Sequence, residues 1–411
     1  MHLRDVCIPA ASDRVAERVA RESYGRLVAL LAARTRDVAE AEDALADAFA
    51  AALRVWPIDG APDNPEAWLF AAARRRLIDG ARRAATAKAG EARIVGAMEE
   101  IAADMQGAAD IPDRRLGLMF ACAHPAIEPG VRTALMLQTV LGLSAERIAA
   151  AFLIEPAAMS QRLVRAKQRI RYSGSPFEIP PPEHWPARIG AVLDAIYAAY
   201  GEGWTETTGE RRALSEETMW LGRVLAHTAP DEPEAVGLLA LMLHLEARRP
   251  ARRDAEGRYV PLAEQDNTLW DSVKIDEAER LLLRAAPMGR FGRYQLEAAI
   301  QSAHAARATT GRTDWVTILA LYEALVALTQ SPVAKLNRAA ALAQAGGAAT
   351  ALGELDALAA ELADYQPYWA LRAHLLSDVG RLVEARDAYA AAIARERDPA
   401  VIAFLQAKAE I

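Results

Sequence analysis

Cysteine and long apolar stretches are scarce in this sequence. The 411 residues include two cysteines, Cys7 and Cys122, which are too few for a disulfide framework and suit a reducing compartment. No apolar stretch reaches the ~18 residues of a membrane span, and the first residues lack the apolar segment of a signal peptide. We therefore expect a cytoplasmic protein with no membrane partner.

Catalytic and metal-binding motifs are missing as well. The seven histidines are scattered, without HExxH or paired-cysteine spacing, and neither a P-loop nor a GxSxG motif occurs. His124, which directly precedes Pro125, suits a helix boundary better than a metal ligand. The sequence therefore predicts a protein that is not an enzyme, with no catalytic residue, no metal and no cofactor.

Runs of the β-branched residues Val, Ile and Thr are also rare, whereas alanine is abundant. Alanine is the best helix former and β-branched residues favour strands, so the expected fold class is all-α. A chain of 411 residues exceeds what one hydrophobic core usually serves, which predicts roughly two to four domains.

Acidic residues are unevenly distributed along the chain, whose net charge is −7 at pH 7. Residues 1–175 hold 24 basic and 22 acidic side chains, whereas residues 176–411 hold 24 and 33. The acidic second part should avoid DNA, so a nucleic-acid partner is expected at the first part.

The first 83 residues predict three helices, with a proline-rich loop before the last. Apolar side chains from Tyr24 to Leu31 recur at three- and four-residue steps, which indicates an amphipathic helix. Pro57 is expected to end a second helix. Asn64 can cap a third, with Pro65 at its first position and Arg83 near its end.

That third helix is basic, and the segment upstream of it is acidic. Its arginines, close to Trp68, suit a DNA strand whose bases are unstacked, although Trp68 by itself fits core packing better. The upstream carboxylates indicate a surface for a basic protein partner, and the alternative is a solvated acidic face. The arginines are Arg74, Arg75, Arg76, Arg82 and Arg83, and the carboxylates are Asp37, Glu40, Glu42, Asp43 and Asp47.

The strongest local pattern is a pair of short helices between Leu143 and Arg171. Ser144 suits an N-cap and Pro156 the first position of a second helix, which together predict a helix-turn-helix. Residues 157–171 contain five basic side chains and no acidic one. Such a helix can enter the major groove; the alternative is a solvated basic helix packed on a neighbour. We expect Leu163, Ala166 and Ile170 on its inward face, and Arg162, Arg165 and Arg169 on another.

Prolines at 176 and 180–182 mark a boundary, after which two more helical blocks are expected. The block at 184–290 is interrupted at 252–261 by a polar stretch that indicates a loop or short hairpin. A spacing of 34 residues in the last block predicts tetratricopeptide-like (TPR-like) helical hairpins. This spacing aligns Gly346 with Gly380, Ala351 with Ala385, and Leu355 with Tyr389.

Two sets of side chains in the C-terminal half allow more than one interpretation. Aromatic residues there could line a ligand pocket, but they more often pack between helices. A run of arginines could clamp another part of the protein or a partner, or could lie in a solvated loop. The aromatic residues are Tyr200, Trp204, Trp220, Trp270 and Tyr294, and the arginines are Arg248, Arg249, Arg252 and Arg253.

Three sets of stretches carry a family resemblance. The first set is 36–49 (RDVAEAEDALADAF), 64–69 (NPEAWL) and 73–79 (ARRRLID), the second is 143–171, and the third is 197–204, 239–244, 247–252, 264–267 and 269–271. The first set resembles sigma region 2 of extracytoplasmic-function sigma factors, of the sigma-70 family. The second resembles sigma region 4, and the third resembles the long C-terminal helical extension of one subgroup.

This resemblance implies a sigma factor that directs promoter-specific transcription initiation. Its implied partners are promoter DNA and core RNA polymerase, through the β′ clamp helices and the β flap. Ala46 departs from the Gln that the family often has before Asp47, at a polar polymerase contact. The implied polymerase-binding residues are Glu42, Asp43, Asp47 and Phe49; those for the −10 element are Asn64, Trp68, Arg74, Arg75, Arg76, Asp79, Arg82 and Arg83; those for the −35 element are Ala157, Ser160, Gln161, Arg162, Arg165 and Arg169.

The acidic C-terminal half is expected to regulate the factor in cis, because it is covalently joined to a basic DNA-binding part. It could bind a protein, a small molecule, or regions 2 and 4. The alternative function is a helix-turn-helix repressor or activator with a helical sensing domain, acting without core polymerase. The predicted domains are region 2 at 1–87, a linker at 88–112, region 4 at 113–173, the helical extension at 184–290 and TPR-like repeats at 291–411.

Overall fold

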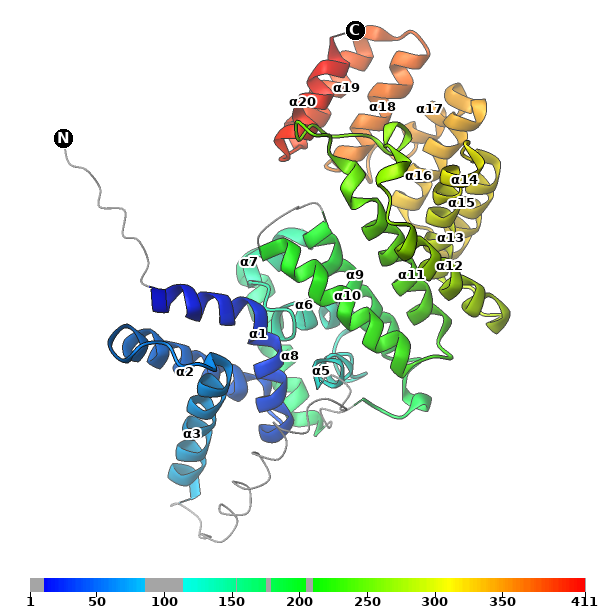
Figure 1. The fold of residues 1–411 in the computed structure, drawn as a ribbon. Coiled ribbons are helices and arrows are strands. Elements are labelled where there is room, and N and C mark those ends of the chain that lie inside the picture. Colours follow the sequence, from blue (N-terminus) through cyan, green and yellow to red (C-terminus); the bar gives the residue numbers. More distant parts are fainter. Residues whose placement is uncertain (1–10, 86–113, 153, 175–178, 205–209, 411) are drawn as a thin grey trace, which may run out of the picture. The chain divides into compact units, whose positions relative to one another are not determined.

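All regular secondary structure in the described part of the chain is helical (Figure 1). The computed structural model describes residues 11–85, 114–152, 154–174, 179–204 and 210–410. Strand pairing in these residues is limited to one isolated bridge, so the predicted all-α fold is confirmed. The chain divides into two compact units, Met1–Thr228 and Ala229–Ile411. This division falls inside residues 184–290, so a single domain over that range stays a prediction. The predicted linker 88–112 lies outside the described residues.

The first unit is built around a short, buried helix. Its described α-helices are α1 (Ala11–Thr35), α2 (Val38–Asp59), α3 (Pro65–Ala85), α5 (Arg114–Cys122), α6 (Pro129–Thr139), α7 (Ala145–Ala151), α8 (Pro156–Ser173), α9 (Ile189–Trp204) and α10 (Glu210–Thr228). Helix α5 is buried from Arg115 to Cys122. Helix α1 packs on α2, α3 and α5, and α6 packs on α5, α8 and α9, so α5 lies at the centre of this unit's core.

Short polar side chains begin these helices where the sequence predicts them. The Asn64 Oδ1 accepts a hydrogen bond from the N–H of Ala67 at 3.0 Å, and Pro65 opens α3. The Ser144 hydroxyl caps α7 by accepting from the N–H of Arg147 at 3.3 Å. Each cap gives an acceptor to an N–H that has no partner within the helix.

The end of α2 differs from the prediction. Pro57 does not stop this helix, which continues to Asp59. Gly60, with a φ of 85°, donates its N–H to the Trp56 carbonyl at 3.0 Å. A proline in the last turn removes one donor only, and it is the left-handed glycine after it that ends the helix.

Asp37 is the N-cap of α2, and it is 6% exposed. Its Oδ1 accepts from the N–H groups of Ala39 at 3.0 Å and Glu40 at 3.3 Å. We expect Asp37→Ala to lower the free energy of unfolding by about 1 kcal/mol, because two helix N–H groups lose their acceptor. Asp37→Asn keeps a side-chain oxygen and should cost less. Urea unfolding measures both variants, and equal losses would contradict the capping role.

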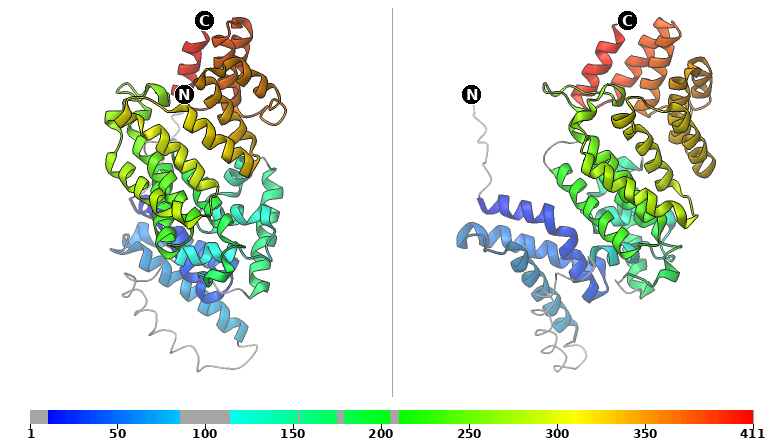
Figure 2. Two further views of the ribbon diagram at one scale, coloured as in Figure 1. Left: turned by 90° about the vertical axis from the view of Figure 1, so that its right-hand side faces the viewer. Right: turned by 45° about the vertical axis from the view of Figure 1, so that its right-hand side comes forward.

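Helices of the second unit pack mainly on their neighbours in the chain. The described α-helices are α11 (Pro233–Arg248), α12 (Ser272–Ala285), α13 (Arg293–Ala305), α14 (Arg307–Thr310), α15 (Trp315–Thr329), α16 (Pro332–Leu342), α17 (Ala348–Asp356), α18 (Gln366–Asp378), α19 (Leu382–Arg395) and α20 (Pro399–Ala409). Helix α11 packs on α12 and α13, α13 on α15, and α15 to α20 pack in succession. In both views of Figure 2 the last three, orange to red, lie side by side. Packing between successive helices is typical of helical repeats and agrees with the TPR-like prediction.

The 34-residue spacing has a structural counterpart. Both aligned glycines have a positive φ and lie between two helices, where a side chain would be strained. The aligned small and large positions on the helices are all buried. The values are φ 102° at Gly346 and 78° at Gly380, and exposed fractions of 0% at Ala351, Ala385 and Leu355 and 4% at Tyr389.

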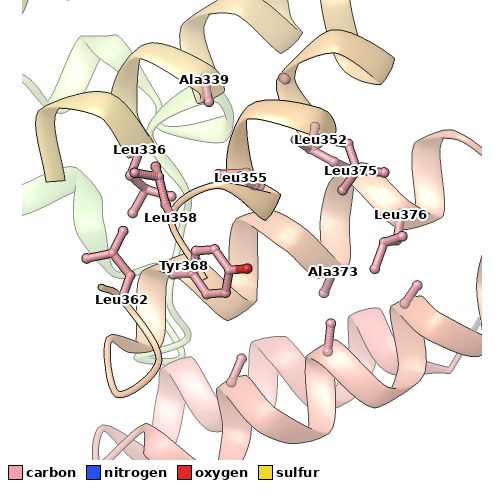
Figure 3. Packing of buried hydrophobic residues seen from close by; sticks show 14 of the residues in the cluster. Leu336, Ala339, Leu352, Leu355, Leu358, Leu362, Tyr368, Ala373, Leu375 and Leu376 are labelled. Atoms are coloured by element: carbon pink, nitrogen blue, oxygen red, sulfur yellow. The ribbon is translucent and has the colours of Figure 1, made fainter. Parts of the chain in front are cut away.

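The core of these hairpins contains the aromatic ring of Tyr368 (Figure 3). Tyr368 of α18 is 1% exposed, and its ring lies among leucines of the preceding helix and turn, Leu355, Leu358 and Leu362. Ala373 on the same helix is fully buried. The Tyr368 ring thus fills the space between α18 and the helix and turn that precede it.

The polar stretch after α11 forms the short hairpin that the sequence left as one alternative. Arg253 and Tyr259 make the antiparallel bridge. The Arg253 guanidinium is paired with Asp398, and the Tyr259 ring packs edge-on against Phe404 at 5.4 Å. These contacts fix the hairpin to α20.

Most of the ambiguous C-terminal side chains are packed inside their unit. Arg248 and Arg249 are 6% and 7% exposed, so a solvated loop is the wrong interpretation for these two. Among the aromatic residues, Trp220 is 44% exposed and has the Arg115 guanidinium 4.9 Å from its ring. Helix packing is confirmed for Tyr200, Trp270 and Tyr294, which are 1%, 6% and 3% exposed.

Candidate DNA and polymerase interfaces

Helices α7 and α8 form the predicted helix-turn-helix. They pack on each other and on α6, and the Ile154 N–H in the turn donates to the Ala149 carbonyl at 2.9 Å. Pro156 opens α8, which is where its missing N–H is tolerated. Ile148 and Ala149 are fully buried, so the first helix is anchored and supports the second.

The second helix, α8, has one buried and one exposed face. Met159, Leu163, Ala166 and Ile170 are at most 3% exposed, and the last three are the inward face that the helical period predicts. An anchored helix with an exposed arginine face has the geometry for the major groove. All six side chains implied for the −35 element are exposed: Ala157, Ser160, Gln161, Arg162, Arg165 and Arg169.

Two of these six side chains make local hydrogen bonds. The Ser160 hydroxyl donates to the Pro156 carbonyl at 2.9 Å, a back-bond common for serine in helices. The Arg165 Nε donates to the Gln161 carbonyl at 3.3 Å. A hydroxyl oxygen can still accept, and a guanidinium carries five N–H donors, so both side chains keep the capacity to contact DNA.

Helix α3 carries the side chains implied for the −10 element. Trp68 is half-buried, and its ring packs edge-on against Trp56 at 5.4 Å, as core packing predicts. Arg74 is half-buried; partial burial and the nearby charge of Arg34 lower its pKa. The others are placed as follows: Asn64, Arg75, Arg76 and Asp79 are exposed, and the side chains of Arg82 and Arg83 lie outside the described part of the structure.

Two of the four side chains implied for polymerase binding are in ion pairs within this unit. The Asp47 Oδ2 lies 2.6 Å from the Arg76 Nε, and both side chains are about half exposed, so solvent weakens their attraction. The Glu42 Oε2 lies 2.5 Å from the Lys167 Nζ. Of the other two, Asp43 is exposed and Phe49 is half-buried.

The Glu42–Lys167 pair is largely shielded from water. The exposed fractions of the two side chains are 15% and 12%. Burial raises the pKa of Glu42, and the ammonium of Lys167 opposes this effect. A shielded pair of this kind is costly to break from one side, because the remaining charge stays buried.

Sequence reasoning missed the part of α8 that faces α2. Lys167 and Arg171 count as basic side chains of a DNA-binding helix, yet they form ion pairs with Glu42 and Asp37. One signal was present in the sequence. Lys167 and Arg171 are four residues apart, and each directly follows a position of the predicted inward face, Ala166 or Ile170. That periodicity places them at the edge of the inward face.

Comparison with known protein families identifies the chain. Residues 19–86 match the family model of sigma-70 region 2, and residues 188–286 match a family of unknown function, DUF6596. An uncharacterized protein of Rhizobium meliloti (strain 1021) is 38% identical over 378 residues, which cover 90% of this chain and 89% of that protein. The chain belongs to the sigma-70 family. It is a sigma factor similar to the extracytoplasmic-function group, with a C-terminal extension. No solved structure matches it.

In this sigma factor, region 2 comprises α2, α3 and most of α1, because the match runs over 19–86. Family membership supports a role in transcription initiation and points to a transcription factor that is not an enzyme. Among the helices described, none has the length and apolarity needed to cross a membrane.

Proposed function

We propose that this sigma factor binds core RNA polymerase in the cytoplasm and directs initiation at promoters with defined −10 and −35 elements. The observation that carries this proposal is the exposed arginine face of α8, on an anchored helix-turn-helix in the same chain as region 2. Arginine is the side chain best suited to bidentate contacts with guanine or phosphate. Helix α8 then acts as the region 4 helix at the −35 element.

Region 2 supplies the other two contacts in this proposal. The exposed arginines of α3, with Asn64 and Trp68, hold an unpaired strand at the −10 element. Unstacking a base costs a few kcal/mol, which stacking and charged contacts must offset. Glu42, Asp43 and Asp47, with Phe49, bind basic side chains of the β′ clamp helices, and region 4 binds the β flap.

The C-terminal extension regulates the factor in cis in this proposal. Its first helices are packed on the region 4 segment: Trp185 stacks on Phe120 with ring centroids 5.9 Å apart, and Arg147 lies 3.3 Å from Glu202. The Arg115 side chain, in the core of the unit, is paired with Glu217. A signal received by the extension therefore has a direct physical route to region 4.

Run-off transcription with bacterial core polymerase on a randomised promoter library tests the proposal. We expect the full chain to select templates and initiate on them only together with core polymerase, and to bind the same duplexes weakly by itself. Tight duplex binding without polymerase, and no initiation from any template, would instead support a helix-turn-helix repressor or activator.

A truncation tests regulation in cis. Cutting after Thr228, the end of the first compact unit, keeps α9 and α10 in place. A cut after Tyr172 would remove α9, which packs on α6, and α10, which packs on α9. We expect the truncated chain to differ from the full chain in promoter output by severalfold. Equal output and equal stability would exclude a regulatory role for residues 229–411.

A further inference from the structure

Three side chains that can carry positive charge meet where the region 4 segment joins the extension. His124 lies in the turn between α5 and α6, Arg132 near the start of α6, and Arg188 directly before α9. Burial, and then the charges of Arg188 and Arg132, lower the pKa of His124. Burial and the charge of Arg132 lower the pKa of Arg188. The three groups are therefore close enough for their positive charges to repel one another.

Arg132 is held by three backbone carbonyls. Its Nε donates to the Ile127 carbonyl at 3.0 Å and its Nη2 to the Pro125 carbonyl at 3.3 Å, both in the α5–α6 turn. Its Nη1 donates to the Ala187 carbonyl at 3.3 Å, in the segment that precedes α9. One guanidinium thus joins region 4 to the extension. Carbonyl oxygens are uncharged, so the positive charge of Arg132 is not neutralised by these bonds.

Arg188 has a buried donor without an acceptor. Its Nη1 donates to the Phe120 carbonyl at 3.4 Å, whereas its Nε is buried and none of the described residues accepts from it. Leaving a buried donor unmade is destabilising, and in a native protein such a donor indicates a bound water or ion.

The cluster has no compensating carboxylate in the part of the chain that the structure describes. Only the neighbouring cations, and no negative charge, add to burial in shifting the pKa values of His124 and Arg188. The His124 Nδ1 accepts from the Ala126 N–H at 3.1 Å, so a neutral ring carries its proton on Nε2. All three side chains therefore offer N–H donors and positive potential, which suits an anion.

We propose that His124, Arg132 and Arg188 bind the phosphate group of a small molecule. A phosphate group carries about −1.5 to −2 charges at pH 7, which matches two guanidinium charges better than one carboxylate does. Its oxygens can accept from both guanidiniums at once and give the Arg188 Nε its missing acceptor. Bound there, it links the α5–α6 turn to the segment before α9. The site is independent of the proposed function, whereas any effect on promoter output rests on the proposed regulation in cis.

Titration of the full chain with inorganic phosphate, at constant ionic strength set by chloride, tests the site. Isotope-labelled arginine reports the Nε–H signals of Arg132 and Arg188, and we expect both to shift saturably in the wild type. Followed at Arg132, binding should weaken about tenfold or more in Arg188→Gln, because charged hydrogen bonds are lost. Arg280→Gln, at an exposed arginine of α12, is the matched control and should bind as the wild type does. No saturable shift in the wild type, or equal affinity of the two variants, would overturn the proposal.

Hydrogen exchange in the wild type covers the case in which Arg188→Gln fails to fold. Phosphate should slow amide exchange severalfold at residues 123–127 and 184–189, on the two sides of the site. Amides of α18 and α19, in the other unit, report the general stabilisation that phosphate gives to folded proteins. Equal slowing in all of these segments would overturn the site.

Duplex DNA distinguishes a small molecule from the DNA backbone as the source of the phosphate group. A promoter duplex should leave phosphate binding unchanged, and Arg188→Gln should leave the salt dependence of duplex binding unchanged. Displacement of phosphate by the duplex, with a salt dependence reduced by about one contact in the variant, would overturn the small-molecule source. Because these titrations contain no polymerase, they can succeed even if run-off transcription shows no initiation, so the two proposals fail separately.

Discussion

Replacing Arg162 and Arg165 together by alanine should reduce promoter-dependent initiation by roughly 30-fold to 10⁴-fold. Each exposed guanidinium that makes a bidentate base contact contributes about 1–3 kcal/mol, so the pair contributes about 2–6 kcal/mol. Both side chains lie away from the core of the helix-turn-helix, so the variant should fold normally. Run-off transcription with core polymerase, on templates that the wild type selects, measures the effect.

The pattern across templates separates base contacts from phosphate contacts. Loss of a base contact lowers initiation most on the preferred −35 sequence, whereas loss of a phosphate contact weakens all sequences alike and reduces the salt dependence. Gln168→Ala, an exposed change on the same helix outside the residues assigned to DNA, is the control. If the double variant initiates as well as the wild type, α8 is not the −35 helix.

Acidification should destabilise the second unit, by about 2 kcal/mol at pH 5 from one side chain alone. His244 of α11 is 1% exposed, and burial, together with the charge of Arg248, lowers its pKa to about 3. The Glu279 carboxylate lies 3.5 Å away but is 39% exposed, so water screens it. The unfolded chain regains a pKa near 6.5 and binds the proton first, so stability falls as pH falls from about 6.5 towards 3.

Hydrogen exchange of the α11 amides at pH 7.5 and pH 5, corrected for intrinsic rates, measures this loss in the full chain. His304 of α13, whose pKa burial lowers to about 4, should add to it in the same direction. His244→Leu should remove the part that His244 contributes. His374→Gln, at a side chain that is 51% exposed, is the control and should leave the pH dependence of stability unchanged. If His244→Leu and His374→Gln changed that pH dependence equally, burial of His244 would not be its cause.

The local elements of this protein follow from short stretches of its sequence. Asn64 with Pro65, and Ser144 before α7, start helices through bonds that span three residues, so neighbours in the chain suffice to predict them. The buried stripe of α8 follows from a period of 3.6 residues. Gly346 and Gly380 mark repeated turns because positive φ favours glycine wherever it occurs.

Pro57 is an intermediate case. A proline in a helical pattern predicts an end at or before it, but its effect depends on how many turns follow. Here the helix had only two more residues to form, so the lost hydrogen bond was confined to the last turn. The boundary was decided by Gly60, a local signal that was present in the sequence but outweighed by the proline.

Which charges meet each other was decided by the tertiary structure alone. The sequence by itself determined an all-α chain, a helix-turn-helix with an arginine face, and a 34-residue repeat, because each depends on residues a few positions apart. Lys167 and Glu42 are 125 positions apart, and the helical period places Lys167 at the edge of the inward face without indicating its partner. Their pairing depends on how α2 and α8 pack, and burial at that contact makes one lysine part of the core while its neighbours stay exposed.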